Sequence, residues 1–261
     1  SRANTVRIDK NTLHLVLDSA GARILHITAD GKLLPPLFLI AEPDETGAPD
    51  RKQPEVLDAT RFGARPNSQP QTAALQKALD ACAARATGGI VYIPEGCYLT
   101  GTLRVQSNTR LYLAAGAVLR AVDDPTAFPP DTGQTESGDE GIHHSHSRLL
   151  LFDRARHSGL FGRGTLDGNG AVLRNRHKRR VQLIDAHDCR DLRIEGVVLR
   201  NTASWTLHIL HCDGVRVTDV KILTDWDVAN SDGIDPDSSR NVLIERLFCY
   251  SGDDAIAVKT T

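Results

Sequence analysis

This sequence of 261 residues contains no methionine, and aromatic residues make up only 5% of it. Neither charge sign is in excess, because 31 Lys and Arg residues face 33 Asp and Glu residues, which argues against a broad basic surface for nucleic acid. Long apolar runs are also missing: the stretch from Leu33 to Ala41 is interrupted by Pro35 and Pro36, so no membrane-spanning segment is predicted. Recognition through charge must therefore depend on local clusters.

Cysteine spacings typical of metal sites are lacking as well. The five cysteines are odd in number and contain no CxxC pair, so neither a disulfide framework nor a zinc site is predicted. We expect buried free thiols at Cys82, Cys97, Cys189, Cys212 and Cys249.

A weak internal repeat is present in the second half of the chain. Each copy has a small residue or Cys, then a charged pair typical of turns, then an apolar-x-apolar strand, in residues 183–199, 207–223 and 233–249. The same place in these copies is held by Leu192, Val215 and Val242, which are 23 and 27 residues apart. Looser copies put Leu160 and Leu111 there.

Units of this length bury their inward residues only by stacking on the next unit. Helical periodicity between the strands is absent, which argues against alternating strands and helices. The sequence therefore predicts an all-β fold, a right-handed parallel β-helix or solenoid.

One amphipathic helix is predicted ahead of the coils. Leu75, Ala78, Leu79 and Cys82 follow an i, i+3, i+4, i+7 stripe, and the glycines at 88–89 provide a stop. We expect this helix to cap the first coil. Residues 1–55 are predicted to be a small β-rich appendage and linker, and residues 56–261 a β-helical domain. Because residues 255–261 read as the opening strand of another coil, we expect that domain to be incomplete at its C-terminus.

Five aspartates crowd into one stretch of the chain, at Asp232, Asp235, Asp237, Asp253 and Asp254. Asp232 and Asp253 are 21 residues apart, close to one repeat, so we expect them on one face of neighbouring coils, roughly 4.8 Å apart along the axis. Like charges this close raise the pKa of at least one carboxyl group. A protonated carboxyl beside ionised ones meets the requirement of an inverting glycosidase. Turn formation and calcium binding are the alternatives.

The stretches NSDGIDPDSSRNV (230–242) and SGDDAIAVK (251–259) resemble the Asn-x-Asp and Gly-Asp-Asp motifs of glycoside hydrolase family 28, the polygalacturonases and related pectin hydrolases. The resemblance covers residues 57–261. It implies a right-handed parallel β-helix that hydrolyses α-linked galacturonate-containing polysaccharide with inversion, without a cofactor or metal.

Carried onto this sequence, the resemblance makes Asp253 the general acid and makes Asp232 and Asp254 the pair that holds and deprotonates water. Asn230 is placed on the substrate, whereas Asp235 and Asp237 are expected to be turn or supporting groups. The family's later His-Gly and Arg-x-Lys motifs should lie beyond Thr261. These motifs do not determine whether cleavage is endo or exo. They also do not determine whether the substrate is homogalacturonan or rhamnogalacturonan.

Further side chains are candidates for substrate binding. Lys259 is similar to a Lys of exo-acting members, where it would meet an acidic sugar, and a solvated lysine is the alternative. Trp205 and His208 are predicted as a sugar platform and a hydrogen-bond partner, with core or edge packing as the alternative. Trp226 is a second possible platform.

Two other clusters are interpreted more plainly. The histidines His143, His144 and His146 suggest a loop near the substrate rather than a metal site. The basic run at residues 174–180 is expected to be a solvated loop.

The expected partner is pectin or a related polysaccharide, and a monomer is expected. Ser1 follows no visible leader, and we interpret this N-terminus as processed or engineered, so a secreted or periplasmic location is inferred from the substrate alone. The alternative function is a non-catalytic β-helical carbohydrate-binding or scaffold protein whose aspartates bind calcium or nothing. A pectate lyase on the same architecture would need calcium and a basic catalytic residue.

Overall fold

The computed structural model describes residues 5–9, 12–16, 21–25, 28–29, 31–33, 37–129 and 147–260. The chain divides into two compact units, Ser1–Gly47 and Ala48–Thr261. The histidine cluster at residues 143–146 lies outside the described residues.

The first unit consists of short antiparallel strand pairs. The paired strands are β1 (Thr5–Asp9) with β2 (Thr12–Val16), β3 (Gly21–Leu25) with β6 (Leu37–Ala41), and β4 (Thr28–Ala29) with β5 (Lys32–Leu33). Among the described residues, each of these sheets has two strands, so the unit is built from local pairings.

The second unit is a parallel β-helix, as the repeat predicts, and its described strands form three parallel sheets. The seven-stranded sheet contains β7 (Val56–Asp58), β8 (Gly89–Ile93), β11 (Thr109–Leu113), β14 (Arg156–Gly162), β17 (Arg190–Glu195), β20 (Asp213–Thr218) and β23 (Arg240–Glu245). The six-stranded sheet contains β9 (Gly96–Thr100), β12 (Ala117–Ala121), β15 (Thr165–Asp167), β18 (Val198–Arg200), β21 (Lys221–Leu223) and β24 (Phe248–Tyr250). The five-stranded sheet contains β10 (Leu103–Arg104), β13 (Ser147–Asp153), β16 (Val181–His187), β19 (Leu207–Leu210) and β22 (Ile234–Asp237).

The register confirms one predicted ladder and corrects another. Leu192 pairs with Val215, which pairs with Val242, as the repeat predicts. The repeat predicts that Leu160 lies opposite Leu192. In the structure Leu160 pairs with Ile194, two residues further along β17, and Ser158 pairs with Leu192. A shift of two residues keeps every side chain on the same face of a strand, so the apolar pattern alone could not detect it.

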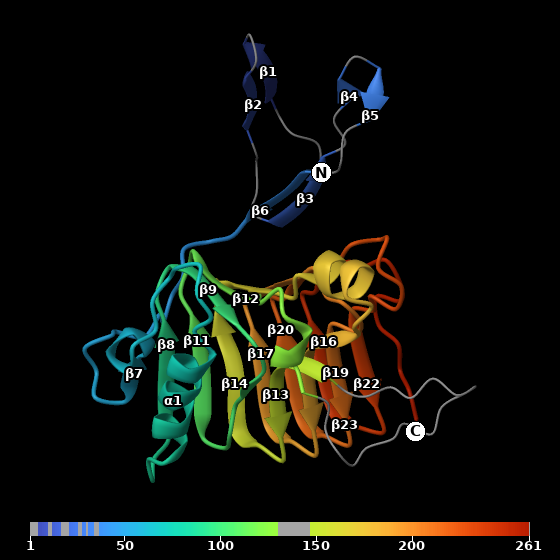
Figure 1. The fold of residues 1–261 in the computed structure, drawn as a ribbon. Coiled ribbons are helices and arrows are strands. Elements are labelled where there is room, and N and C mark those ends of the chain that lie inside the picture. The colour runs from blue at the N-terminus through green and yellow to red at the C-terminus, as the bar shows by residue number, and fades with distance from the viewer. Residues whose placement is uncertain are drawn as a thin grey trace. The chain divides into compact units, whose positions relative to one another are not determined.

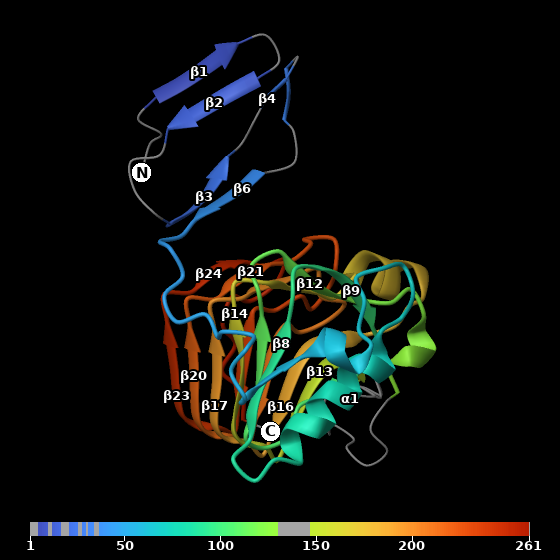
Figure 2. The ribbon, with the colours of Figure 1, turned by 90° about the vertical axis from the view of Figure 1, so that its left-hand side faces the viewer.

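The predicted helix is present as α1 (Thr72–Ala83), and its buried stripe is Leu75, Ala78, Leu79 and Cys82. It packs against β8, β10 and β11, so it covers the first coil (Figures 1 and 2). Short helical turns also occur at η1 (Ala59–Phe62), η2 (Pro125–Ala127) and η3 (Ala171–Arg176). No helix in the described part of the chain has the length and apolar character needed to cross a membrane.

Cysteines follow the coil pattern with one exception. Cys189 and Cys212 are buried on adjacent coils, where the Cys189 N–H donates to the Cys212 sulfur at 3.3 Å. Cys82 is also buried, and Cys249 is half-buried. Cys97 is exposed, so its predicted burial was wrong: it occupies an outward position in β9, whose inward positions are Tyr98 and Thr100.

The turns from the five-stranded to the seven-stranded sheet repeat one backbone conformation. Arg154, Asp188, His211 and Ser238 each have a positive φ, between 44° and 52°. Such angles are uncommon outside glycine. Each of these residues nevertheless donates its N–H to a carbonyl of the next coil, at 2.7 to 3.0 Å, so the ladder of hydrogen bonds continues through the turns and stabilises them.

Candidate active site

Three of the predicted aspartates converge where two adjacent coils enter the five-stranded sheet. Asp232 lies two residues before the start of β22, and Asp253 and Asp254 follow β24 in the next turn. One carboxylate oxygen from each of Asp232, Asp253 and Asp254 lies within 4.8 Å of one from each of the others. Asp232 is 5% exposed, whereas Asp253 and Asp254 are exposed. The cluster therefore combines one buried carboxyl with two that face solvent.

The register changes which aspartate lies opposite Asp232. Ile234 pairs with Ile256, and the Gly233 N–H donates to the Asp254 carbonyl at 2.8 Å. Asp254 is therefore the register partner of Asp232, and Asp253, which was expected on the same face of the neighbouring coil, precedes that partner by one residue. The approximate repeat length could not separate two consecutive aspartates.

The turn that carries Asp253 is tightly packed. The Asp253 carboxylate accepts a hydrogen bond from the Asp254 N–H at 3.0 Å. The backbone carbonyl of Asp253 accepts one from Ser251 Oγ at 2.8 Å. The Gly252 N–H donates to Thr224 Oγ1 at 3.0 Å. A Cβ on Gly252 would lie 2.7 Å from Ser231 Oγ, so glycine is required at this position.

Lys259 lies beside the cluster. Its ammonium is 2.7 Å from Asp235 Oδ1 and 3.6 Å from Asp232 Oδ2. The same nitrogen lies 3.6 Å from the centroid of the Trp205 ring, a cation–π contact. Lys259 thus contacts carboxylates of the protein itself, and half-buried Trp205 lines the same space.

Burial perturbs two carboxyl groups next to this lysine. Removal from water raises the pKa of Asp232; Lys259 opposes this change and Asp253 adds to it. Burial raises the pKa of Asp235 to about 7, against hydrogen bonding from Lys259, with the Asp232 charge adding to the rise. A strongly perturbed pKa at a cluster of charges is typical of functional sites.

Asp235 is the functional candidate that sequence reasoning undervalued. It is completely buried, and it follows Ile234, which continues the inward ladder of the core. Its cross-strand partner is His208. These two polar residues lie on one face of the five-stranded sheet, and the apolar pair of Leu207 and Ile234 lies on the opposite face. The signal in the sequence was a polar residue alternating with apolar ones in both strands.

His208 is not positioned to touch a sugar. Its side chain is completely buried, with Nδ1 at 3.3 Å from Asp185 and Nε2 at 3.5 Å from Asp237. Arg148, also buried, holds Asp185 through a hydrogen bond of 2.7 Å. The alternative of core packing therefore describes His208, and its predicted direct contact with substrate has no support. Asp237 lies in β22 as a supporting group, not in a turn.

Asn230 and Trp226 lie on the loop that leads into Asp232. Asn230 is half-buried and has a φ of 58°, which asparagine tolerates better than most residues. Trp226 is 64% exposed, and its ring lies 5.3 Å from that of Tyr250 at an interplanar angle of 32°. Most of the Trp226 side chain is therefore exposed to solvent.

In the part of the chain that the structure describes, two groups of side chains have ligand atoms close enough for a metal ion: the aspartate trio, and His187 with Asp188 and His211. In the trio the Lys259 ammonium already neutralises part of the charge at 3.6 Å from Asp232, which disfavours a divalent cation there. In the second group the nitrogen to oxygen distances are 3.7 Å from His187 and 4.0 Å from His211 to Asp188. Exposed acidic groups are common at such distances from their neighbours without an ion.

The basic run at residues 174–180 has a structural partner. Arg176 and His177 contact the two oxygens of Asp123 at 2.8 Å and 2.5 Å. Asp123 follows β12 in an earlier coil, so the run is anchored to the β-helix rather than being only a solvated loop.

Comparisons with known proteins find relatives of this chain. Residues 132–261 match the family model described as Glycosyl hydrolases family 28. A probable polygalacturonase of Vitis vinifera is 31% identical over 185 residues, which cover 66% of this chain and 37% of the relative. An endo-polygalacturonase of Pectobacterium carotovorum subsp. carotovorum is 26% identical over 216 residues, covering 74% and 52%. The structure of a polygalacturonase from Erwinia carotovora ssp. carotovora aligns with a TM-score of 0.64 at 25% identity, covering 84% of this chain and 61% of that one.

The parallel coils define the class of β-helical proteins, and here two adjacent coils bring three carboxylates together. Within that class, the chain belongs to glycoside hydrolase family 28, which confirms the resemblance of the two motifs. The chain spans 37% of the length of the Vitis relative and 52% of the Pectobacterium relative.

Proposed function

We propose that this chain carries the acid and base carboxylates of an inverting hydrolase of α-linked galacturonate-containing polysaccharide. The observation that carries the proposal is the convergence of Asp232, Asp253 and Asp254 within 4.8 Å, next to the ammonium of Lys259. Membership of glycoside hydrolase family 28 and the polygalacturonase relatives support the reaction and the substrate class.

In the proposed reaction, Asp253 is the acid. It is exposed, so it can meet the glycosidic oxygen and give it a proton while the bond from that oxygen to the anomeric carbon breaks. Asp232 and Asp254 hold a water molecule whose oxygen attacks the anomeric carbon from the opposite face and whose proton passes to one of these carboxylates.

The spacing of the carboxylates suits a shared water molecule. Oxygens within 4.8 Å of one another are closer than the carboxyl groups of a typical inverting glycosidase, which are about 6.5–9.5 Å apart. A water molecule that donates hydrogen bonds of about 2.8 Å to two carboxylates spans about 4.5 Å between their oxygens. Asp232 and Asp254, which the register aligns, fit that requirement.

The proposed roles of Lys259 are to keep the buried Asp232 ionised and to add positive charge where an acidic sugar arrives. Trp205 below it, the exposed ring of Trp226 and the side chain of Asn230 are proposed to bind the sugar rings. The proposed partner is therefore pectin or a related polysaccharide, and a secreted or periplasmic location follows from that substrate.

The test is incubation of the protein with polygalacturonate and with rhamnogalacturonan, with product lengths measured by chromatography. We expect shortened oligosaccharides whose new reducing ends are first β, observed by proton NMR before mutarotation. New ends that are first α would contradict inversion. No cleavage, together with stoichiometric calcium binding that Asp232→Asn abolishes, would favour the non-catalytic alternative.

A further inference from the structure

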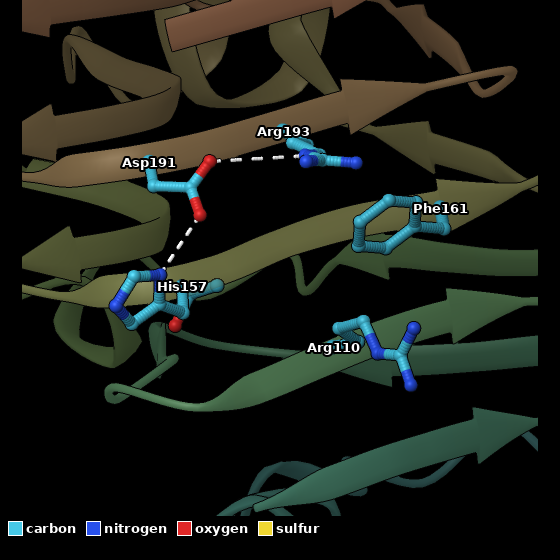
Figure 3. A pocket seen from close by; sticks show the side chains of 6 residues that line it. Arg110, His157, Phe161, Asp191 and Arg193 are labelled. Carbon is cyan, nitrogen blue, oxygen red and sulfur yellow. Dashed lines mark hydrogen bonds and ion pairs between the residues drawn. The ribbon is translucent and has the colours of Figure 1, made fainter. Parts of the chain in front are cut away.

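The outer face of the seven-stranded sheet carries a hollow that belongs to a different sheet from the aspartate cluster. Its volume is about 270 Å³, and it is lined by Arg110, His157, Ser158, Phe161, Asp191 and Arg193 from β11, β14 and β17. Figure 3 shows the Phe161 ring between Arg110 and Arg193, with Asp191 between His157 and Arg193.

A glycine produces this hollow. Arg110 pairs with Gly159, which pairs with Arg193, so the middle position of this cross-strand row has no side chain. A Cβ on Gly159 would lie 2.7 Å from the Phe161 ring, which shows that the ring lies across the bare backbone. Neighbouring strands are about 4.8 Å apart, and β14 lies between the strands of the two arginines. The backbone positions of Arg110 and Arg193 are therefore about 10 Å apart, with the Phe161 ring between their side chains.

The hollow has an excess of positive charge. Asp191 is engaged by His157 at 2.8 Å and lies 3.8 Å from Nε of Arg193. Among the described residues, Arg110 has no carboxylate within ion-pair distance. One carboxylate therefore faces two guanidinium groups, both exposed.

The chemistry of these groups selects a ligand class. A guanidinium binds a carboxylate in a planar, two-pronged arrangement. A half-buried aromatic ring offers a flat apolar surface suited to the C–H face of a sugar ring. A sugar that carries a carboxylate meets both requirements, whereas a neutral sugar leaves the arginines unused.

The concave surface also continues beyond a single sugar. A second hollow of about 440 Å³ shares Arg110 and His157 with the first and adds Glu55 and Asn108. A ligand of several sugar units can therefore extend from Phe161 past Arg110 toward β8.

We propose that this face is a non-catalytic binding site for uronate oligosaccharides, in which Phe161 supports a sugar ring and Arg110 and Arg193 bind carboxylates. The site does not depend on the proposed hydrolysis. It would hold an acidic polysaccharide on a sheet other than the one that carries the aspartates.

The experiment is a titration of the protein, in an Asp253→Asn background, with trigalacturonate at low salt, following the Nε–Hε NMR signals of Arg110 and Arg193. Low salt is needed because ion pairs of exposed groups are screened. We expect saturable shifts of both signals. Arg110→Gln and Arg193→Gln should each weaken this binding about tenfold, or about 1.4 kcal/mol, because each removes a charged partner of a ligand carboxylate. Phe161→Leu, which keeps an apolar side chain, should also weaken it.

Arg216→Gln is the matched control, because Arg216 follows Arg193 in the same cross-strand row but does not line the hollow. It should leave the binding unchanged. The proposal is overturned if neither arginine signal moves, if neutral galactotriose gives equal shifts, or if inorganic phosphate binds as tightly. A protein that hydrolyses pectin without these shifts would overturn this site and leave the proposed function standing.

Discussion

At the scale of single residues, Lys259 is the group on which the ionisation of the site depends. It has one ammonium between two buried carboxyl groups, with the Trp205 ring at 3.6 Å. Its positive charge lowers the pKa of both Asp232 and Asp235 and so works against their burial. The lysine therefore stabilises the charged form of Asp232, which the proposed activation of water requires.

Replacing this lysine with methionine should move the pH dependence of hydrolysis. Without the ammonium the pKa of Asp232 rises, so a higher pH is needed to ionise the base, and the acidic limb of the kcat profile moves to higher pH. At acidic pH we expect turnover to fall at least about tenfold. The exposed Lys77→Gln, on α1, is the control. If the limb of Lys259→Met coincides with that of the parent, Lys259 has no part in the ionisation of Asp232.

Asp235 should leave a signature in stability. Its pKa is near 3.8 when unfolded and about 7 when folded, so the folded state binds the proton more tightly. Between about pH 4 and pH 7 the unfolded chain loses this proton first, and the contribution of Asp235 to stability declines as pH rises. Asparagine cannot ionise, so the free energy of unfolding of Asp235→Asn should improve relative to the parent across this window. Urea denaturation at several pH values measures the difference.

The control for this measurement is Glu95→Gln, which changes an exposed carboxyl group between β8 and β9. A constant difference between Asp235→Asn and the parent from pH 4 to pH 7 would contradict the raised pKa.

Asp253→Asn tests the proposed acid. The side chain is exposed, and the amide oxygen of asparagine can still accept the hydrogen bond from the Asp254 N–H, so the fold should remain intact. The loss of a general acid should lower kcat on polygalacturonate about 10²–10⁴-fold. Asp227→Asn, on the exposed loop ahead of Asn230, should retain parental turnover. Near-parental kcat for Asp253→Asn would exclude it as the acid.

At the scale of elements, the turn at residues 251–254 fixes the positions of two of the three carboxylates. Gly252→Ala introduces a methyl group 2.7 Å from Ser231 Oγ and 2.8 Å from the Trp226 Cα, and the backbone carbonyl of Asp225 is 2.9 Å away. Because part of this contact is backbone, the turn must shift. We expect a large loss of kcat with retained secondary structure, measured by kinetics and circular dichroism.

Gly214→Ala is the comparison, because Gly214 has a φ of 77° but its added Cβ has no contact closer than 3.7 Å. It should cost about 1–2 kcal/mol of stability from backbone strain and leave kcat unchanged. Equal kinetic losses in the two variants would mean that displacement of the turn is not the cause.

Many of the helices and strands could be predicted, because they follow from the spacing of apolar residues close together in the sequence. The helix at Thr72–Ala83 and the ladder of Leu192, Val215 and Val242 follow from apolar spacing alone. The alignment of Asp254 with Asp232 could not be predicted, since loops of unequal length make the repeat approximate. The contacts of Lys259 depend on that register, so its position between Asp235 and Asp232 was also out of reach.

At the scale of the whole molecule, the division at Gly47 predicts independent folding of the β-helical unit. Residues 48–261 contain α1, the three parallel sheets and the main buried core. Removing residues 1–47 should therefore leave the far-ultraviolet spectrum of a β protein and a cooperative thermal transition within a few degrees of that of the parent. Loss of the cooperative transition would show that the β-helix needs the first unit.

The parallel pairing of Ile234 with Ile256 also means that the β-helix sets the distance between functional groups on adjacent coils. Groups supplied by consecutive coils are separated by the rise of one coil, about 4.8 Å, and not by the length of the loop between them. Distances along the axis between such groups are therefore multiples of about 4.8 Å. Inserting an entire coil ahead of β19 would leave the carboxylate spacing untouched, whereas a slip of one residue in the pairing of Ile256 with Ile234 would turn the side chains of that segment to the other face.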